Sequence, residues 1–127
     1  FRMANGKKTW FFADGYLPYK GCAPADAPLE GHEAIMILNC NEQDAHVCME
    51  IYYEDQEPSR GIVLTVPAQR IRSFHMNVPE EIGGVKIEPQ RQYALRFESD
   101  VEVIIQYGRM DLSQPNLAYM ALIGHGE

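Results

Sequence analysis

The chain has 127 residues, a length that buries one hydrophobic core but not two. Its apolar fraction of 46% and charged fraction of 23% are typical of a soluble globular protein. The formal net charge of −7 argues against nucleic acid and anionic membrane as default partners, because both require a basic face.

The following features predict the domain boundaries and the cellular compartment of the chain. We expect residues 1–8 to be an N-terminal extension or a remnant of cloning, with Met3 as the natural start, and residues 9–124 to form one domain. No apolar run approaches the roughly 20 residues that cross a bilayer. The three cysteines are odd in number and have no CxxC spacing, so neither a disulfide framework nor a zinc site is expected. A reducing cytoplasm is the expected location.

The elements expected along the chain are short β-strands. The apolar runs are rich in Val, Ile and Tyr, and turns containing Gly, Pro, Asn and Asp separate them. The expected strands are, in chain order, Thr9–Ala13, Glu33–Leu38, Val47–Tyr53, Ile62–Val66, Ile71–Met76, Tyr93–Phe97, Val101–Tyr107 and Leu117–Ile123. About eight short strands at this spacing predict a single-domain, all-β antiparallel sandwich or jelly roll.

Alternation is clearest in Val47–Tyr53 and Val101–Tyr107, where every second residue is apolar and belongs on the core face. The run Ile35–Leu38 is apolar on both faces, which predicts a central or covered strand. Ser99-Asp100 predicts a tight reversal between two strands. Gly15–Gly31, with three prolines, reads as an ordered irregular loop of the kind that is often functional. Val78–Gln92 is expected to be a second loop.

His32-Glu33 resembles half of the metal site of a cupin-type sandwich enzyme. Such enzymes supply an HxH pair, and this chain has none. A strand-end His bonded to backbone or to a carboxylate is the preferred interpretation, so no metal site and no cofactor are predicted.

Arginines at two places in the sequence are expected to bind an acidic side chain or a ligand. Arg70 and Arg72 are two apart in a strand and project from one face, and carboxylates or an anionic ligand usually hold such a pair together. The alternative is a solvated edge with acidic partners, which this chain has in excess. Arg109 and Asp111 continue the core face of the preceding strand. A core-facing guanidinium needs a partner, which is either an acid or a bound ligand.

Trp10 is the only tryptophan of the chain. Aromatic faces bind sugar rings, but a lone Trp belongs more often to a core. Nucleophile and nucleotide motifs such as GxSxG, the P-loop, GxGxxG and HExxH are absent, so the sequence predicts a protein that is not an enzyme.

Several motifs occur together in one order from Trp10 to Ile123. They are Trp10-(x)3-Asp14-Gly15-Tyr16-(x)-Pro18, His32-Glu33-(x)4-Leu38-Asn39, Asp44-Ala45-His46-Val47, Ile51-Tyr52-Tyr53, Leu64-Thr65-Val66-Pro67-Ala68-(x)-Arg70 and Gln106-(x)2-Arg109-(x)-Asp111. In this order and spacing they resemble the sensory rhodopsin transducer family.

The resemblance implies a cytoplasmic sandwich of jelly-roll type that assembles as a homotetramer and has a non-enzymatic role in signalling or small-molecule binding. Carbohydrate-like ligands are the usual proposal for relatives without a rhodopsin. On that basis the expected ligand-binding residues are Trp10, His32, Glu33, Asn39, Arg70, Gln106, Arg109 and Asp111.

Three functions follow from these observations. The first is a signalling module that binds a small polar, sugar-like ligand. The second is a protein-interaction adapter that docks on a membrane receptor such as a sensory rhodopsin, or on a regulator, and it predicts that Arg70, Arg109 and His32 are buried in ion pairs or in a subunit interface. The third is a cupin-like metalloenzyme. Nucleic-acid binding comes last, since it needs a concentrated basic patch at a net charge of −7.

Overall fold

The computed structural model describes residues 5–18, 31–111 and 118–127. Within these residues the chain forms eight strands, one short 3-10 helix and only antiparallel strand pairs. The elements are β1 (Lys7–Tyr16), β2 (His32–Asn39), β3 (Ala45–Tyr53), β4 (Ser59–Val66), β5 (Arg70–His75), η1 (Pro79–Glu81), β6 (Gln92–Asp111), β7 (Ala118–Ile123) and β8 (His125–Gly126). The predicted all-β antiparallel sandwich is confirmed.

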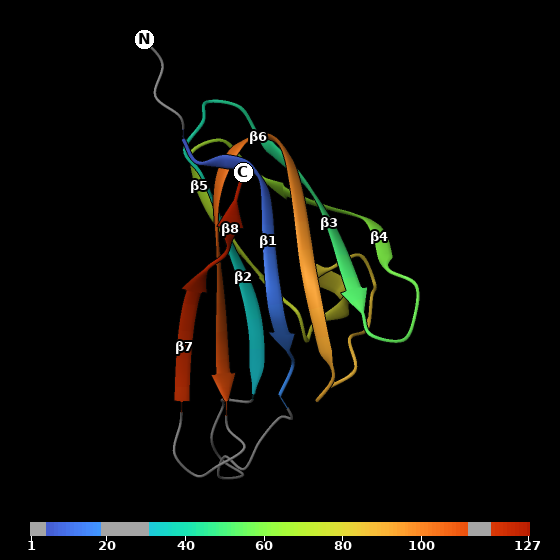
Figure 1. The fold of residues 1–127 in the computed structure, drawn as a ribbon. Helices are drawn as coiled ribbons and strands as arrows, with labels where there is room; N and C mark the ends of the chain where they lie inside the picture. The colour runs from blue at the N-terminus through green and yellow to red at the C-terminus, as the bar shows by residue number, and fades with distance from the viewer. Residues whose placement is uncertain (1–4, 19–30, 112–117) are drawn as a thin grey trace.

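Two layers share the long strand β6. Its first half pairs with β1 and β3, and β4 and β8 extend this layer, which we call sheet A. Its second half pairs with β2 and β7, and β5 pairs with β2, which gives sheet B the order β5-β2-β6-β7. In Figure 1, β6 rises beside β1 and β3, bends at the top of the view and descends beside β2 and β7.

The expected tight reversal at Ser99-Asp100 needs correction. The direction of the chain changes there, but β6 stays one strand of 20 residues, and its two halves lie in opposite sheets instead of forming a hairpin. Between the pairs Thr9–Glu98 and Lys7–Val103, β6 advances five residues while β1 advances two. This irregularity bends the strand across the end of the sandwich.

The inward faces of the two sheets form one hydrophobic core. Val47, Met49 and Ile51 of β3 are fully buried, as the alternation predicted, and so are Val103 and Ile105 of β6. β2 lies between β5 and β6, which confirms the prediction of a central strand. The face of β2 that points away from the core is only partly covered, with Met36 half-buried and Leu38 exposed.

Several boundaries differ from the expected ones. β1 begins at Lys7 and continues to Tyr16, and the unpredicted β8 pairs with Trp10 and Phe11 of β1. Most of the expected loop Gly15–Gly31 and residue Leu117 lie outside the described residues. Among the residues described, no helix is long and apolar enough to span a membrane.

The sandwich has two ends. The lower end of Figure 1 gathers the end of β1, the start of β2 and both termini of β6, so Tyr16, His32, Gln92 and Asp111 mark it. The upper end carries the start of β1, the end of β2 and the bend of β6, near Lys7 and Asn39.

Candidate functional site

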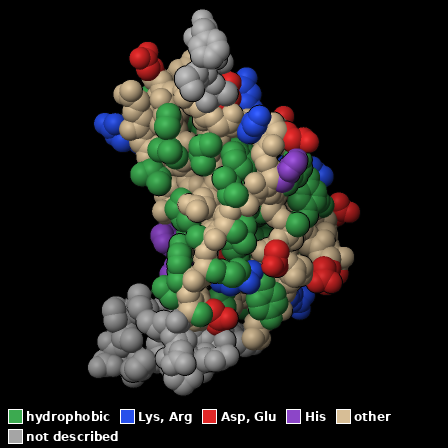
Figure 2. Space-filling view, turned by 60° about the vertical axis from the view of Figure 1, so that its left-hand side comes forward, with side chains coloured by type: hydrophobic (Ala, Val, Ile, Leu, Met, Phe, Trp, Pro, Cys, Tyr) green, Lys and Arg blue, Asp and Glu red, His purple; other side chains and the backbone are tan. Residues whose placement is uncertain are grey.

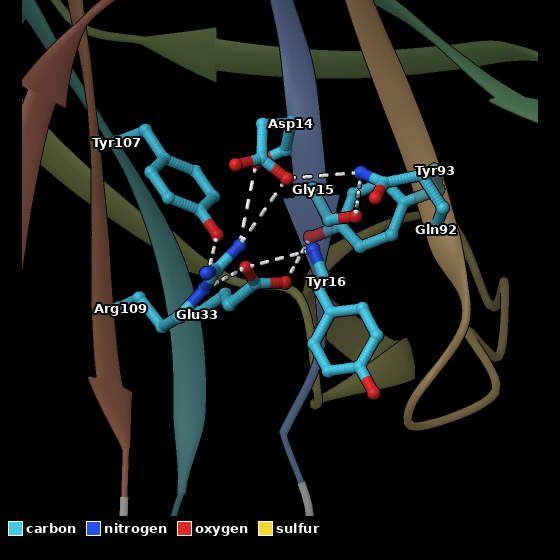
Figure 3. A network of polar contacts seen from close by, with 8 residues as sticks. All are labelled: Asp14, Gly15, Tyr16, Glu33, Gln92, Tyr93, Tyr107 and Arg109. Carbon is cyan, nitrogen blue, oxygen red and sulfur yellow. Dashed lines mark hydrogen bonds and ion pairs between the residues drawn. The ribbon is translucent and has the colours of Figure 1, made fainter.

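A buried carboxyl group lies at the centre of the lower end. Glu33 is 0% exposed, the second residue of β2, and points between the sheets. Its Oε1 accepts a short hydrogen bond from the Tyr93 hydroxyl of sheet A. Its Oε2 accepts from the Tyr16 amide at 3.0 Å and from Arg109 Nε at 2.9 Å. One side chain therefore joins β1, β2 and both ends of β6 (Figure 3).

A bulge in β1 brings the second acid of the site into position. Phe12 pairs with Leu95 and Gly15 with Tyr93, so β1 carries one residue more than β6 between these pairs. Gly15 fits because a Cβ there would be 2.4 Å from the Tyr93 ring. Asp14 Oδ1 then accepts a 3.0 Å hydrogen bond from Gln92 Nε2.

Arg109 is held from several sides. Its Nε also donates to the Tyr107 hydroxyl at 2.9 Å, and its side chain is 16% exposed. Its outer nitrogen lies 3.9 Å from Asp14 Oδ1. The guanidinium carbon lies 5.9 Å from the ring centroid of Tyr16 and 5.6 Å from that of Tyr107, within cation–π range.

The electrostatics follow from burial. Removal from water raises the pKa of the Glu33 carboxyl above its ordinary value, and hydrogen bonds from Tyr93, the Tyr16 amide and Arg109 oppose this shift without cancelling it. Burial and the nearby Glu33 charge raise the pKa of the Tyr93 hydroxyl well above its ordinary value. The Tyr93 hydroxyl therefore keeps its proton near pH 7 and acts as a hydrogen-bond donor to Glu33.

The arrangement is a structural tie between the sheets. Glu33 satisfies three donors and Arg109 has three oxygen partners, so the pair meets the requirement that buried charges be paired and hydrogen-bonded. Sequence analysis left open whether an acid or a ligand holds Arg109, and the structure gives Glu33. No group of three or more His, Cys, Asp or Glu residues within the described part of the chain could hold a metal ion.

Three other predicted residues lie near this tie but outside it. His32 begins β2, and its ring lies 5.7 Å from that of His75. Asp111 ends β6 and pairs with Ala118 of β7. Gln106 is exposed on the outer face of sheet B, between Met36 and Ile123. The structure does not bring Gln106 to the polar network.

The remaining predicted residues lie toward the upper end. Asn39, six residues along β2 from Glu33 and so roughly 20 Å away, donates to the carbonyls of Gln43 and Val66 and accepts from the Asn41 amide. This bonding fixes the turns around it. Arg70 pairs with Asn39 across the strands and is exposed.

Trp10 is a core residue at 4% exposure, and its Nε1 donates to two backbone carbonyls. Arg72, the neighbour of Arg70 on the same face, stacks over Phe74 at 4.8 Å and donates to the Thr65 carbonyl. Whether any of the predicted residues binds a ligand stays a prediction.

Sequence reasoning missed four side chains of the network, namely Asp14, Tyr93, Gln92 and Tyr107. Two signals pointed to part of it. Asp14 belongs to a motif that carried the family resemblance, and Tyr107 shares the strand face of Arg109 because the two are two residues apart. Tyr93 gave no local signal, since it is 60 positions from Glu33.

An open cavity of about 460 Å³ adjoins the network. Tyr16, Gln92 and Tyr93 belong to both, so the cavity wall and the buried tie share side chains. The rest of the wall comes from the end of β3 and from the segment that precedes β6. Its acids and bases are mixed, with an ion pair of 3.6 Å between Arg91 and Asp55.

These features define the protein as an antiparallel β-sandwich whose two sheets share one strand and are tied by a buried ion pair. The family model described as Anabaena sensory rhodopsin transducer matches residues 5–126, so the chain belongs to that family.

Two solved structures are similar over most of the chain. A Thermotoga maritima protein designated 1070 superposes with a TM-score of 0.82 at 25% identity, covering 97% of each chain. The Anabaena sensory rhodopsin transducer superposes with a TM-score of 0.66 at 31% identity, covering 84% of this chain and 91% of its own. No curated protein sequence matches the chain.

Proposed function

We propose that the protein is a non-enzymatic cytoplasmic adapter that docks on a membrane receptor such as a sensory rhodopsin and passes on its state. Membership of a transducer family supports this proposal. The observation that carries it is an exposed apolar surface on sheet B. In the polar network at the lower end, Glu33 is hydrogen-bonded to Arg109 and Tyr93 of the same chain, so its carboxyl group is already occupied.

The docking surface, which we call the sheet B face, is the outer side of β5, β2, β6 and β7. Its exposed apolar side chains include Leu38 at 37%, Ile71 at 62%, Tyr119 at 59% and Ile123 at 62%. Hydrophobic side chains gather over this side of the molecule in Figure 2. Exposed apolar surface of this kind marks protein interaction sites.

We also propose that the chain assembles with itself, as a tetramer. β7 supports this, because all six of its residues (Ala118–Ile123) are apolar and exposed, on both faces of the strand. Within the described residues only β6 pairs with it, so its second edge is open. Edge strands of monomers usually carry charges or prolines that prevent pairing, and β7 carries neither. Light scattering on the purified protein should give about four times the mass of one chain, and a monomer mass would contradict this proposal.

A second candidate function is the binding of a small, sugar-like ligand, which the cavity of about 460 Å³ favours. Its aromatic and amide side chains, such as Tyr16, Tyr53 and Gln92, suit a polyhydroxylated ring. A sugar at 100-fold excess over its Kd should add about 2.7 kcal/mol to the stability. If no sugar or sugar acid raises the melting temperature, this candidate is rejected.

Calorimetric titration tests the adapter function directly. The protein is titrated into a sensory rhodopsin held in nanodiscs, and empty nanodiscs of the same lipid serve as the control. We expect saturable heat only with the receptor present. Equal heats from both titrations would contradict receptor docking, whether or not the protein binds a sugar.

A further inference from the structure

A second cavity of about 490 Å³ lies at the lower end, between the end of β1 and the segments on either side of η1. Its walls are mainly aliphatic, from Leu17, Met76, Val78 and Ile87, with prolines completing them. Its volume falls within the range of small-molecule sites, which are mostly apolar with a few polar groups.

The frame of this cavity is fixed by backbone hydrogen bonds. The Gln90 amide donates to the Leu17 carbonyl at 2.8 Å, and the Met76 amide donates to the Glu33 carbonyl at 2.8 Å. Proline rings in the wall restrict the backbone further. The space is therefore preformed, so a ligand need not order it.

Its electrostatics are unlike those of the rest of the molecule. In a chain with a net charge of −7, Lys86 is the only charged residue among the described residues that line it. Lys86 is exposed and forms no ion pair with another described residue. The neighbouring cavity, which shares Lys86, has three acids in its wall. An anion is therefore favoured in the aliphatic cavity.

One more polar group belongs to this wall. Asn77 Oδ1 is buried and has no hydrogen-bond partner. Buried acceptors without a partner are uncommon in native proteins.

We propose that the aliphatic cavity binds a small amphiphilic anion, a molecule with an aliphatic or aromatic body and one carboxylate or sulfonate that meets Lys86. This site is separate from the sheet B face and adjoins the cavity proposed for sugars, with which it shares Lys86 and Ile87. It would give the protein an input that is independent of receptor docking.

The probe is anilinonaphthalene sulfonate, which has an apolar body, an N–H donor and an anionic group, and its fluorescence reports binding. Val78→Trp fills the cavity, and Val63→Trp makes the same change on the outer face of sheet A, where Val63 is 62% exposed. Asn77→Trp replaces Val78→Trp if that variant does not fold. Near-ultraviolet circular dichroism confirms native packing, because loosely packed states also bind this probe and keep their far-ultraviolet signal.

We expect saturable one-to-one binding by the native chain, weakened at least about tenfold by Val78→Trp and unchanged by Val63→Trp. Lys86→Gln should weaken the anionic probe about three- to fivefold and leave the neutral phenylnaphthylamine unaffected, whereas Lys8→Gln should change neither. The proposal is overturned if the native chain shows no saturable binding, if Val78→Trp binds as the native chain does, or if Lys86→Gln and Lys8→Gln behave alike.

Discussion

Replacing Glu33 with Gln tests whether the buried network ties the sheets together. The substitution keeps the shape of the side chain and removes its charge. Arg109, only 16% exposed, then loses its 2.9 Å carboxylate partner, and the acid that remains paired with it among the described residues is the more distant Asp14 at 3.9 Å. Its neutral hydrogen bonds to the Tyr107 hydroxyl and the Asp14 carbonyl do not offset the charge. Breaking one partner of a buried ion pair costs about 3 kcal/mol or more. For a chain of this length that loss lowers the melting temperature by about 10 °C.

Urea unfolding measures the free energy, and an exposed ion pair provides the matched control. Asp55→Asn breaks the pair with Arg91, in which both side chains are about two-thirds exposed, and should cost less than about 0.5 kcal/mol. Adding Arg109→Met to Glu33→Gln removes the orphaned charge and should recover at least about 1 kcal/mol. Glu33 does not tie the sheets together if Glu33→Gln costs no more than Asp55→Asn, or if the double variant loses as much stability as Glu33→Gln and Arg109→Met lose separately, added together.

Three further predictions concern stability. Burial raises the pKa of Glu33, so at a pH between the unfolded and folded values the folded chain holds a proton there that the unfolded chain has lost. The stabilisation of the fold by this proton is complete below the ordinary pKa of a glutamate and is lost as the pH rises through the folded pKa. Melting curves from pH 5 to 7 should therefore show a native chain that gains stability relative to Glu33→Gln toward pH 5, and a gain toward pH 7 would contradict this. Gly15→Ala should cost about 2 kcal/mol in urea unfolding, because the new Cβ would be 2.4 Å from the Tyr93 ring, and a neutral result would mean that β1 can shift freely. Asn39→Ala should cost about 3 kcal/mol, since it leaves the Asn41 amide and its neighbours without their partner, and a loss below about 1 kcal/mol would show that water replaces Asn39.

Local patterns were sufficient to predict the fold class. Alternation in β3 and in the second half of β6 identified buried positions correctly, because one strand face meets the core and the other meets solvent. The same patterns could not predict that β6 crosses between sheets. Ser99 and Asp100 suit a turn and a bend equally, and the choice depends on Val47 and on other partners distant in sequence.

The site was harder to predict, because the sequence at a strand terminus does not reveal at which end of the sandwich that terminus lies. Glu33 and Asn39 both flank the apolar run of β2, yet they lie at opposite ends of the sandwich. Arg70 and Arg109 are separated in the same way, by the antiparallel pairing of β5 and β6 with β2. The need of Arg109 for a partner was predictable from its strand face, whereas the identity of that partner required the topology.

Variants of the sheet B face test receptor docking. Ile123→Lys places a charge on this face, and Val63→Lys places the same charge on the outer face of sheet A at the same 62% exposure. Both are titrated calorimetrically into a sensory rhodopsin in nanodiscs beside the native chain. We predict that Ile123→Lys weakens binding at least about tenfold and that Val63→Lys leaves it within about twofold. Equal affinities for all three proteins, or a loss confined to Val63→Lys, would contradict docking through the sheet B face.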